Sequence, residues 1–176
     1  MSGIGWNPRI TTATQPYTTA TQRAALQSIM KKSNDILMPE FERLLKNGHM
    51  VEFVPRGVSM RPFIEGGSDK VILHECKRPA VGMIVLAKVN DTYVLHRIYK
   101  IEGKQITLRG DGNLTGSETC TAADIIGYVV RLKNKDGKRL RLTNGTVWRH
   151  LPTGIKRFYL KIYRVVIKIQ AYEDEN

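Results

Sequence analysis

The chain has 176 residues, of which 41% are hydrophobic and 25% charged, and its formal net charge is +12 at pH 7. This length and composition predict one globular domain with a modest core. The amino-terminal segment has neither a basic region nor an apolar run, so we expect no signal peptide and no membrane anchor there.

Cysteine and histidine usage gives no sign of a metal site. Cys76 and Cys120 form no CxxC pair, and no cluster of cysteines and histidines has metal-ligand spacing. We therefore expect two reduced thiols, no cofactor and a cytoplasmic protein. His49, His74 and His150 have no catalytic setting and are interpreted as structural or exposed residues.

The first part of the chain predicts an arm followed by helices. Residues 1–20 are rich in threonine and punctuated by proline, which is typical of a mobile arm. Over residues 21–48 apolar side chains recur at helical spacing, and a break at Pro39 predicts two short helices. Asn47 and Gly48 are expected to end the second helix.

Residues 49–143 predict a core that is mostly antiparallel β structure. Short runs of β-branched and apolar residues alternate with turn signals such as Asn90-Asp91 and Gly103. Asp136-Gly137 predicts the turn of a hairpin over residues 124–142. The other expected strands are VEFVP at 51–55, KVILHE at 70–75, MIVLAKV at 83–89, TYVLHRIYKIE at 92–102 and QITLRG at 105–110.

The carboxyl-terminal part, residues 144–176, predicts a basic amphipathic helix over residues 154–172. One helical stripe is apolar and another is basic; the stripes comprise Ile155, Phe158, Ile162, Val165 and Ile169, and Arg157, Lys161, Arg164 and Lys168. The basic stripe excludes a transmembrane helix. We expect the apolar stripe to pack on the core, with an anionic membrane surface as the second candidate partner.

Three short motifs carry the chemistry that the sequence predicts. In GVSMRP, residues 57–62, Ser59 lies on a bend constrained by Gly57 and Pro62. A serine hydroxyl is a weak nucleophile and needs a base, and His96, in a predicted strand 37 residues later, titrates in the right range. Asp111 in the turn TLRGDGN is the candidate that orients His96.

In order and spacing, these motifs resemble the LexA-repressor and signal-peptidase superfamily of serine peptidases over residues 50–130. The segments GGSDKVIL at 66–73, VGMIVLA at 81–87 and DIIGYVV at 124–130 add to the resemblance. It implies a mainly β, α+β fold: a coiled antiparallel catalytic core flanked by amino- and carboxyl-terminal helices. The implied activity is endoproteolysis of a peptide held as an added extended strand.

The resemblance also implies roles for individual residues. Ser59 would be the nucleophile and His96 the base, as in the signal peptidases that use histidine in place of lysine. Main-chain donors near Gly57 and Ser59 would bind the oxyanion, and Met60 and Phe63 would belong to the core or the groove wall. In the Ser-His branch the acid can lie beyond the Gly-Asp-Asn turn, which leaves Glu118 open beside Asp111. This chain departs from the family at Met83, where aspartate is usual, and at Gly112, which is inserted before Asn113.

Two alternatives to a peptide-cleaving enzyme remain open. One is a self-cleaving LexA-type regulator, although fewer than fifty residues precede the core and no Ala-Gly or Cys-Gly dipeptide lies there. The other is a non-catalytic module whose basic carboxyl-terminal region binds nucleic acid or lipid. If the protein is a peptidase, we expect no nucleic-acid partner. The natural substrate and the oligomeric state stay open.

Overall fold

The computed structural model describes residues 37–174, and it describes side chains through residue 169. The predicted arm, and the predicted helical segment up to residue 36, lie outside the described residues. Residues 37–46 are helical, and Gly48 follows them with a φ of 79°. Helical residues lie on both sides of Pro39, which corrects the predicted break at this residue.

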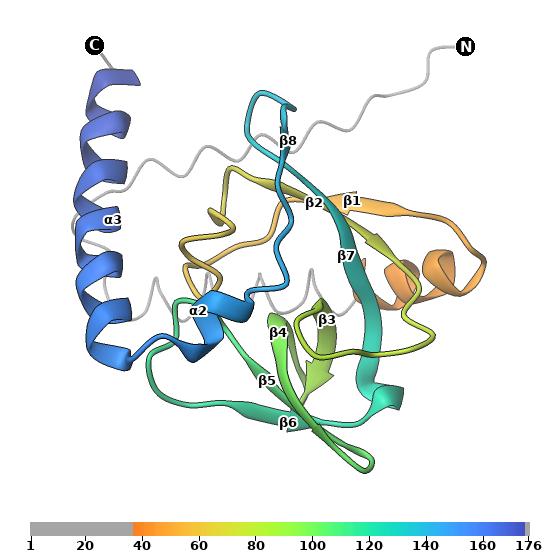
Figure 1. Cartoon of the computed structure of the whole chain (residues 1–176). Helices are drawn as coiled ribbons and strands as arrows, with labels where there is room; N and C mark the ends of the chain where they lie inside the picture. The colour runs from red at the N-terminus through yellow and green to blue at the C-terminus, as the bar shows by residue number, and fades with distance from the viewer. Residues whose placement is uncertain (1–36, 175–176) are drawn as a thin grey trace, which may run out of the picture. The chain divides into compact units, whose positions relative to one another are not determined.

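The described chain is mainly β structure, arranged as one curved antiparallel sheet with a few helices (Figure 1). The strands follow the order β1-β2-β7-β3-β4-β5-β6, and β8 pairs with β7. Their bounds are β1 Val51–Phe53, β2 Lys70–His74, β3 Ile84–Val89, β4 Thr92–Glu102, β5 Gln105–Arg109, β6 Glu118–Cys120, β7 Ile125–Lys133 and β8 Arg139–Leu140. The helices after the first strand are η1 Ala122–Asp124, α2 Thr146–His150 and α3 Thr153–Asp174.

Turn residues fix the register of the central strands. Asn90 and Asp91 have φ values of 46° and 58° and close the tight hairpin that pairs β3 with β4. Two positive φ values in a two-residue turn suit the right-handed twist of the strands it joins. Gly103, with a φ of 56°, belongs to the equally short turn between β4 and β5. The predicted turn at Gly137 is confirmed, but β8 contributes only two residues to the hairpin.

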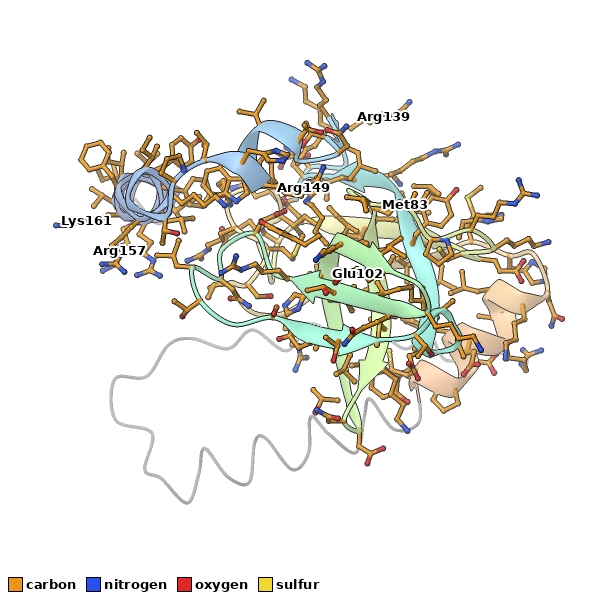
Figure 2. The ribbon with its side chains drawn as sticks, turned by 60° about the horizontal axis from the view of Figure 1, so that its bottom comes forward. Met83, Glu102, Arg139, Arg149, Arg157 and Lys161 are labelled. Atoms are coloured by element: carbon orange, nitrogen blue, oxygen red, sulfur yellow. The ribbon has the colours of Figure 1, made fainter. Side chains whose placement is uncertain are left out.

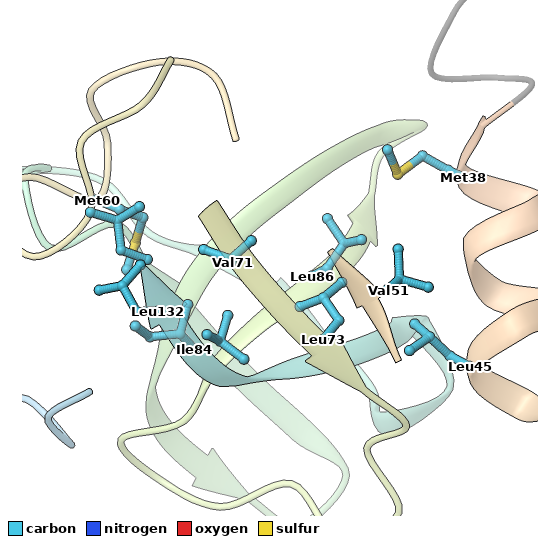
Figure 3. Close-up of a cluster of buried hydrophobic side chains, with 11 residues drawn as sticks. Met38, Leu45, Val51, Met60, Val71, Leu73, Ile84, Leu86 and Leu132 are labelled. Atoms are coloured by element: carbon cyan, nitrogen blue, oxygen red, sulfur yellow. The ribbon is translucent and has the colours of Figure 1, made fainter. Parts of the chain in front are cut away.

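Strand β3 is buried on both faces, which explains its nearly continuous apolar sequence. Ile84 and Leu86 belong to one core cluster, shown in Figure 3, while Val85 and Ala87 belong to a second. Successive side chains of a strand point to opposite faces, so the two clusters lie on opposite sides of the sheet at β3. Leu45 joins the first cluster and connects the helix at residues 37–46 to the sheet.

Helix α3 confirms the predicted helix but does not bury its predicted face. The five residues of the exposed apolar stripe retain 48–67% of their accessible surface: Ile155, Phe158, Ile162, Val165 and Ile169. Lys156 and Leu160 are buried instead, and the Tyr163 hydroxyl lies 3.4 Å from the Glu65 carboxylate. Trp148 of α2 packs edge-on against Tyr159. The expectation that this stripe packs on the core is therefore wrong, because a different face of the helix makes the contact.

Candidate active site

Ser59 lies on a bend that only glycine can form at two points. Gly57 has a φ of 90°, which disfavours side chains, and a Cβ on Gly66 would lie 1.9 Å from the Gly57 carbonyl oxygen. The Gly67 N–H donates to the Pro55 carbonyl at 2.8 Å and closes the loop behind Ser59. This hydrogen bond joins the two ends of the loop that carries Ser59.

The turn after β5 supports the same bend from the other side. The Gly112 N–H donates to the Ser59 carbonyl at 2.7 Å, and a Cβ on Gly110 would lie 2.4 Å from that oxygen. Gly112 thus contacts the peptide group of Ser59 itself. A turn without side chains at these positions allows the two backbones to meet.

Ser59 and His96 line one shallow pocket. Its other walls come from the bend and from the first half of β4; the lining residues comprise Pro55, Arg56, Gly57, Met60, Ile64, Gly66, Tyr93, Val94 and Leu95. The pocket volume is about 130 Å³. Sites that enclose a small molecule usually measure about 300–1,000 Å³, so this pocket fits a side chain of a longer ligand better than a whole small ligand.

One edge of β4 carries no partner strand beside this pocket. Strand β3 pairs with β4 over residues 92–97, whereas β5 pairs with β4 only from Arg97 to Glu102. In the described structure the β5 side of residues 92–96 is therefore unpaired. Such an edge offers backbone N–H and C=O groups to an extended peptide, which would pass between β4 and the Ser59 bend.

His96 is oriented by Glu118. Its side chain is 7% exposed, and Nδ1 lies 2.9 Å from Oε2 of Glu118, which is the first residue of β6. An ionised carboxylate only accepts hydrogen bonds, so Nδ1 carries the proton in the neutral imidazole. Nε2 then holds a free lone pair, as a general base for a serine hydroxyl requires. Within the described residues no hydrogen bond joins Ser59 and His96 directly.

Asp111 has a different partner from the one the sequence suggested. Its fully buried carboxylate accepts three hydrogen bonds from Arg97, at 2.7–3.1 Å, and none from His96. Burial raises the pKa of Asp111, and the hydrogen bonds from the Arg97 guanidinium act in the opposite direction. The expectation that Asp111 orients His96 is thus corrected: the acid that accepts the hydrogen bond from His96 is Glu118, the alternative left open beside Asp111.

Arg97 joins four separate segments of the chain. Its Nη1 donates to the Gly82 and Thr143 carbonyls at 2.8 Å each, while its other nitrogens bind Asp111. The guanidinium carbon lies 5.5 Å from the centre of the Phe63 ring. Residues from the β2–β3 connection, the β5–β6 turn, the Ser59 bend and the segment after β8 therefore meet at one cation.

The remaining predicted site residues divide between the pocket and the core. Met60 lines the pocket and is also buried in the first core cluster. Phe63 does not line the pocket but packs edge-on against Trp148, so the structure supports its core assignment. In the described part of the chain, the backbone N–H groups of Ser59 and Met60 donate to no carbonyl of another loop. Together with the Gly57 N–H, which also donates to no backbone carbonyl of the described residues, they are candidate main-chain donors near the serine.

No protein-family model and no curated protein matches the chain. Among residues 37–174 no group of three or more His, Cys, Asp or Glu side chains could hold a metal ion. No helix in the described part of the chain is long and apolar enough to cross a membrane.

Proposed function

We propose that the protein is a serine endopeptidase of the LexA and signal-peptidase type, with Ser59 as nucleophile and His96 as general base. The observation that carries the proposal is the meeting of Ser59 and His96 in one pocket beside an unpaired strand edge. The hydrogen bond from His96 Nδ1 to Glu118 supports it, because this bond favours the tautomer whose Nε2 is free to accept a proton.

The geometry supports an acyl-enzyme mechanism. A peptide adds as a strand to the free edge of β4, which brings one carbonyl over Ser59. Ser59 Oγ attacks this carbonyl while Nε2 of His96 takes the hydroxyl proton, and Glu118 stabilises the resulting imidazolium. Main-chain N–H groups of the bend, at Gly57, Ser59 and Met60, would stabilise the oxyanion. His96 returns the proton to the leaving amine, and a water molecule activated by His96 then hydrolyses the ester.

Labelling with a fluorophosphonate probe tests the proposal most directly. The wild-type protein should become covalently labelled, and Ser59→Ala should abolish the labelling. Ser68→Ala is the matched control, because Ser68 lies in the same loop and its hydroxyl makes only a 3.4 Å contact with the Glu65 carbonyl. Equal labelling of the wild-type and Ser59→Ala proteins, or no labelling of the folded wild type, would contradict the proposal.

A peptide-release assay adds the role of the base. His96→Asn keeps a polar side chain in a buried position and should abolish cleavage of a peptide library read by mass spectrometry. Circular dichroism of the same sample shows whether the variant is folded. Intact mass after incubation separates cleavage of added peptides from self-cleavage, the outcome expected of a LexA-type regulator.

A further inference from the structure

The surface of α3 divides into three faces of different chemistry. Lys156 and Leu160 are buried, and Tyr163 and Ile167, at the same helical spacing, are half-buried against the rest of the protein. The exposed apolar stripe occupies a second face. A basic row, Arg157, Lys161, Arg164 and Lys168, occupies the third; all four residues are exposed. Figure 2, which looks nearly along α3, shows Arg157 and Lys161 on the same side of this helix.

The exposed apolar stripe is long and continuous. It runs from Ile155 to Ile169, which are fourteen positions apart, or about 21 Å along a helix. Tyr159 and Val166 widen it and are 51% and 44% exposed. Scattered exposed apolar residues are normal, but a contiguous stripe of this kind marks a surface that is covered by something else.

The charge around the stripe identifies what covers it. Residues 137–172 contain nine lysines and arginines and no aspartate or glutamate, so the basic row has no acid within four positions on its own helix. Two copies that met through their stripes would bring two basic rows together without acids between them, which disfavours a homodimer. Nucleic acid would neutralise the basic row but leave the stripe in water. An anionic bilayer surface fits both faces at once, because the apolar side chains can lie below the headgroups while the cations lie among the headgroups.

We propose that α3 is an interfacial helix that docks the protein on an anionic lipid bilayer, with the exposed apolar stripe in the headgroup–acyl boundary and the basic row on the headgroups. This inference is independent of the peptidase activity, because it uses neither Ser59 nor His96. The packed face of α3, not the stripe, contacts the bend that carries Ser59: the Tyr163 hydroxyl lies 3.4 Å from the Glu65 carboxylate, and Glu65 accepts hydrogen bonds from Arg61, two residues after Ser59.

Vesicle co-sedimentation of the full chain tests the proposal. The Ser59→Ala protein serves as the parent, so that binding is measured without catalysis. It should sediment with vesicles of phosphatidylglycerol and phosphatidylcholine and remain in the supernatant with pure phosphatidylcholine. Binding should fall as salt rises, because exposed charges are screened within about 8–10 Å at 0.1–0.15 M salt.

Matched variants separate the two faces. Phe158→Glu/Ile162→Glu should lower the vesicle partition coefficient at least tenfold, whereas Met50→Glu, with 54% exposure directly before β1, should leave it unchanged. Replacing the four residues of the basic row by glutamine should lower it by about fivefold for each charge near the surface. The control replaces Lys77, Arg78, Lys100 and Lys104, which are exposed elsewhere and change the net charge equally.

Tryptophan fluorescence measures insertion of the exposed apolar stripe into the bilayer. A Phe158→Trp reporter should shift its emission to the blue and be quenched by lipids brominated in the acyl chain. The proposal is overturned if the protein ignores anionic vesicles at low salt, or if both α3 variants bind like their controls. It is also overturned if sedimentation shows a dimer that Phe158→Glu/Ile162→Glu dissociates while vesicle binding persists.

Discussion

The buried pair of Arg97 and Asp111 gives the sharpest stability prediction. Both side chains have no exposed surface, and the perturbation is Asp111→Asn, which changes one carboxylate oxygen to an amide and leaves the packing volume nearly unchanged. The Arg97 guanidinium then remains buried without a counter-charge. The new amide N–H₂ group faces the N–H donors of Arg97 and cannot accept hydrogen bonds from them. Removing one partner of a buried ion pair costs about 3–5 kcal/mol of the free energy of unfolding.

The structure supports the upper part of this range. Arg97 also donates to the Gly82 and Thr143 carbonyls, so any shift of the guanidinium away from the new amide strains those two hydrogen bonds. For a chain of this size, about 3–5 kcal/mol corresponds to a fall in melting temperature of about 6–20 °C. The double variant Arg97→Met/Asp111→Leu removes both charges and should be less destabilised than the sum of its single variants.

Urea unfolding at pH 7, followed by circular dichroism, measures these differences. Glu102→Gln is the control, because it breaks the exposed ion pair of Lys100 and Glu102, whose side chains are 63% and 57% exposed. Such a pair contributes about 0–1 kcal/mol. If Asp111→Asn costs no more than Glu102→Gln, the pair does not hold the four segments together and the reasoning is refuted.

Three further predictions concern single groups. Glu118→Gln should slow fluorophosphonate labelling about 10²–10⁴-fold, because an amide can favour the wrong imidazole tautomer; Glu102→Gln should not, and equal rates would remove Glu118 from the site. Burial raises the pKa of Tyr163 to about 12, so the native state keeps a proton that the unfolded chain loses near pH 10. The free energy of unfolding should therefore fall as the pH rises from 10 through 12, and this fall should shrink in Tyr163→Phe; an unchanged slope in urea titrations would contradict it. Burial also raises the pKa of Cys120 to about 11, so at pH 8 iodoacetamide should modify Cys120 only after unfolding and Cys76 first in the native protein, as peptide mass mapping would show.

Local patterns predicted the strands well where the pattern was long or the turn was specific. Runs of β-branched and apolar residues, together with the Asn90-Asp91 turn, placed β3 and β4 nearly to the residue. Strand β6 was missed because three residues, Glu118 to Cys120, carry no periodicity of their own. Helix α2 was missed for the same reason, since its five residues are held by Trp148, whose indole N–H donates to the Asp111 carbonyl. Tertiary contacts, not local preference, form both elements.

The spacing of residues in the sequence could not identify which acid orients His96. In the β4–β5 pairing Arg97 lies opposite Arg109, so the turn that contains Asp111 lies close to His96 and Arg97. This holds whichever of the two side chains Asp111 contacts. His96 and Arg97 are consecutive and point to opposite faces of the strand. The sequence could bring Asp111 to this pair of residues but could not choose between them, because the choice depends on which face the turn folds over.

The same alternation places His96 and Arg97, which are consecutive in one strand, in two different environments. His96 pairs with Val85 on one face of the sheet, and Arg97 pairs with Ile84 on the other. Asp111 pairs with Arg97, the cation next in sequence to the imidazole. Gly110 and Gly112, on either side of Asp111, contact the Ser59 carbonyl directly. A change in the ion pair should therefore displace the bend that carries Ser59, and under the proposed function the rate of fluorophosphonate labelling should fall with it.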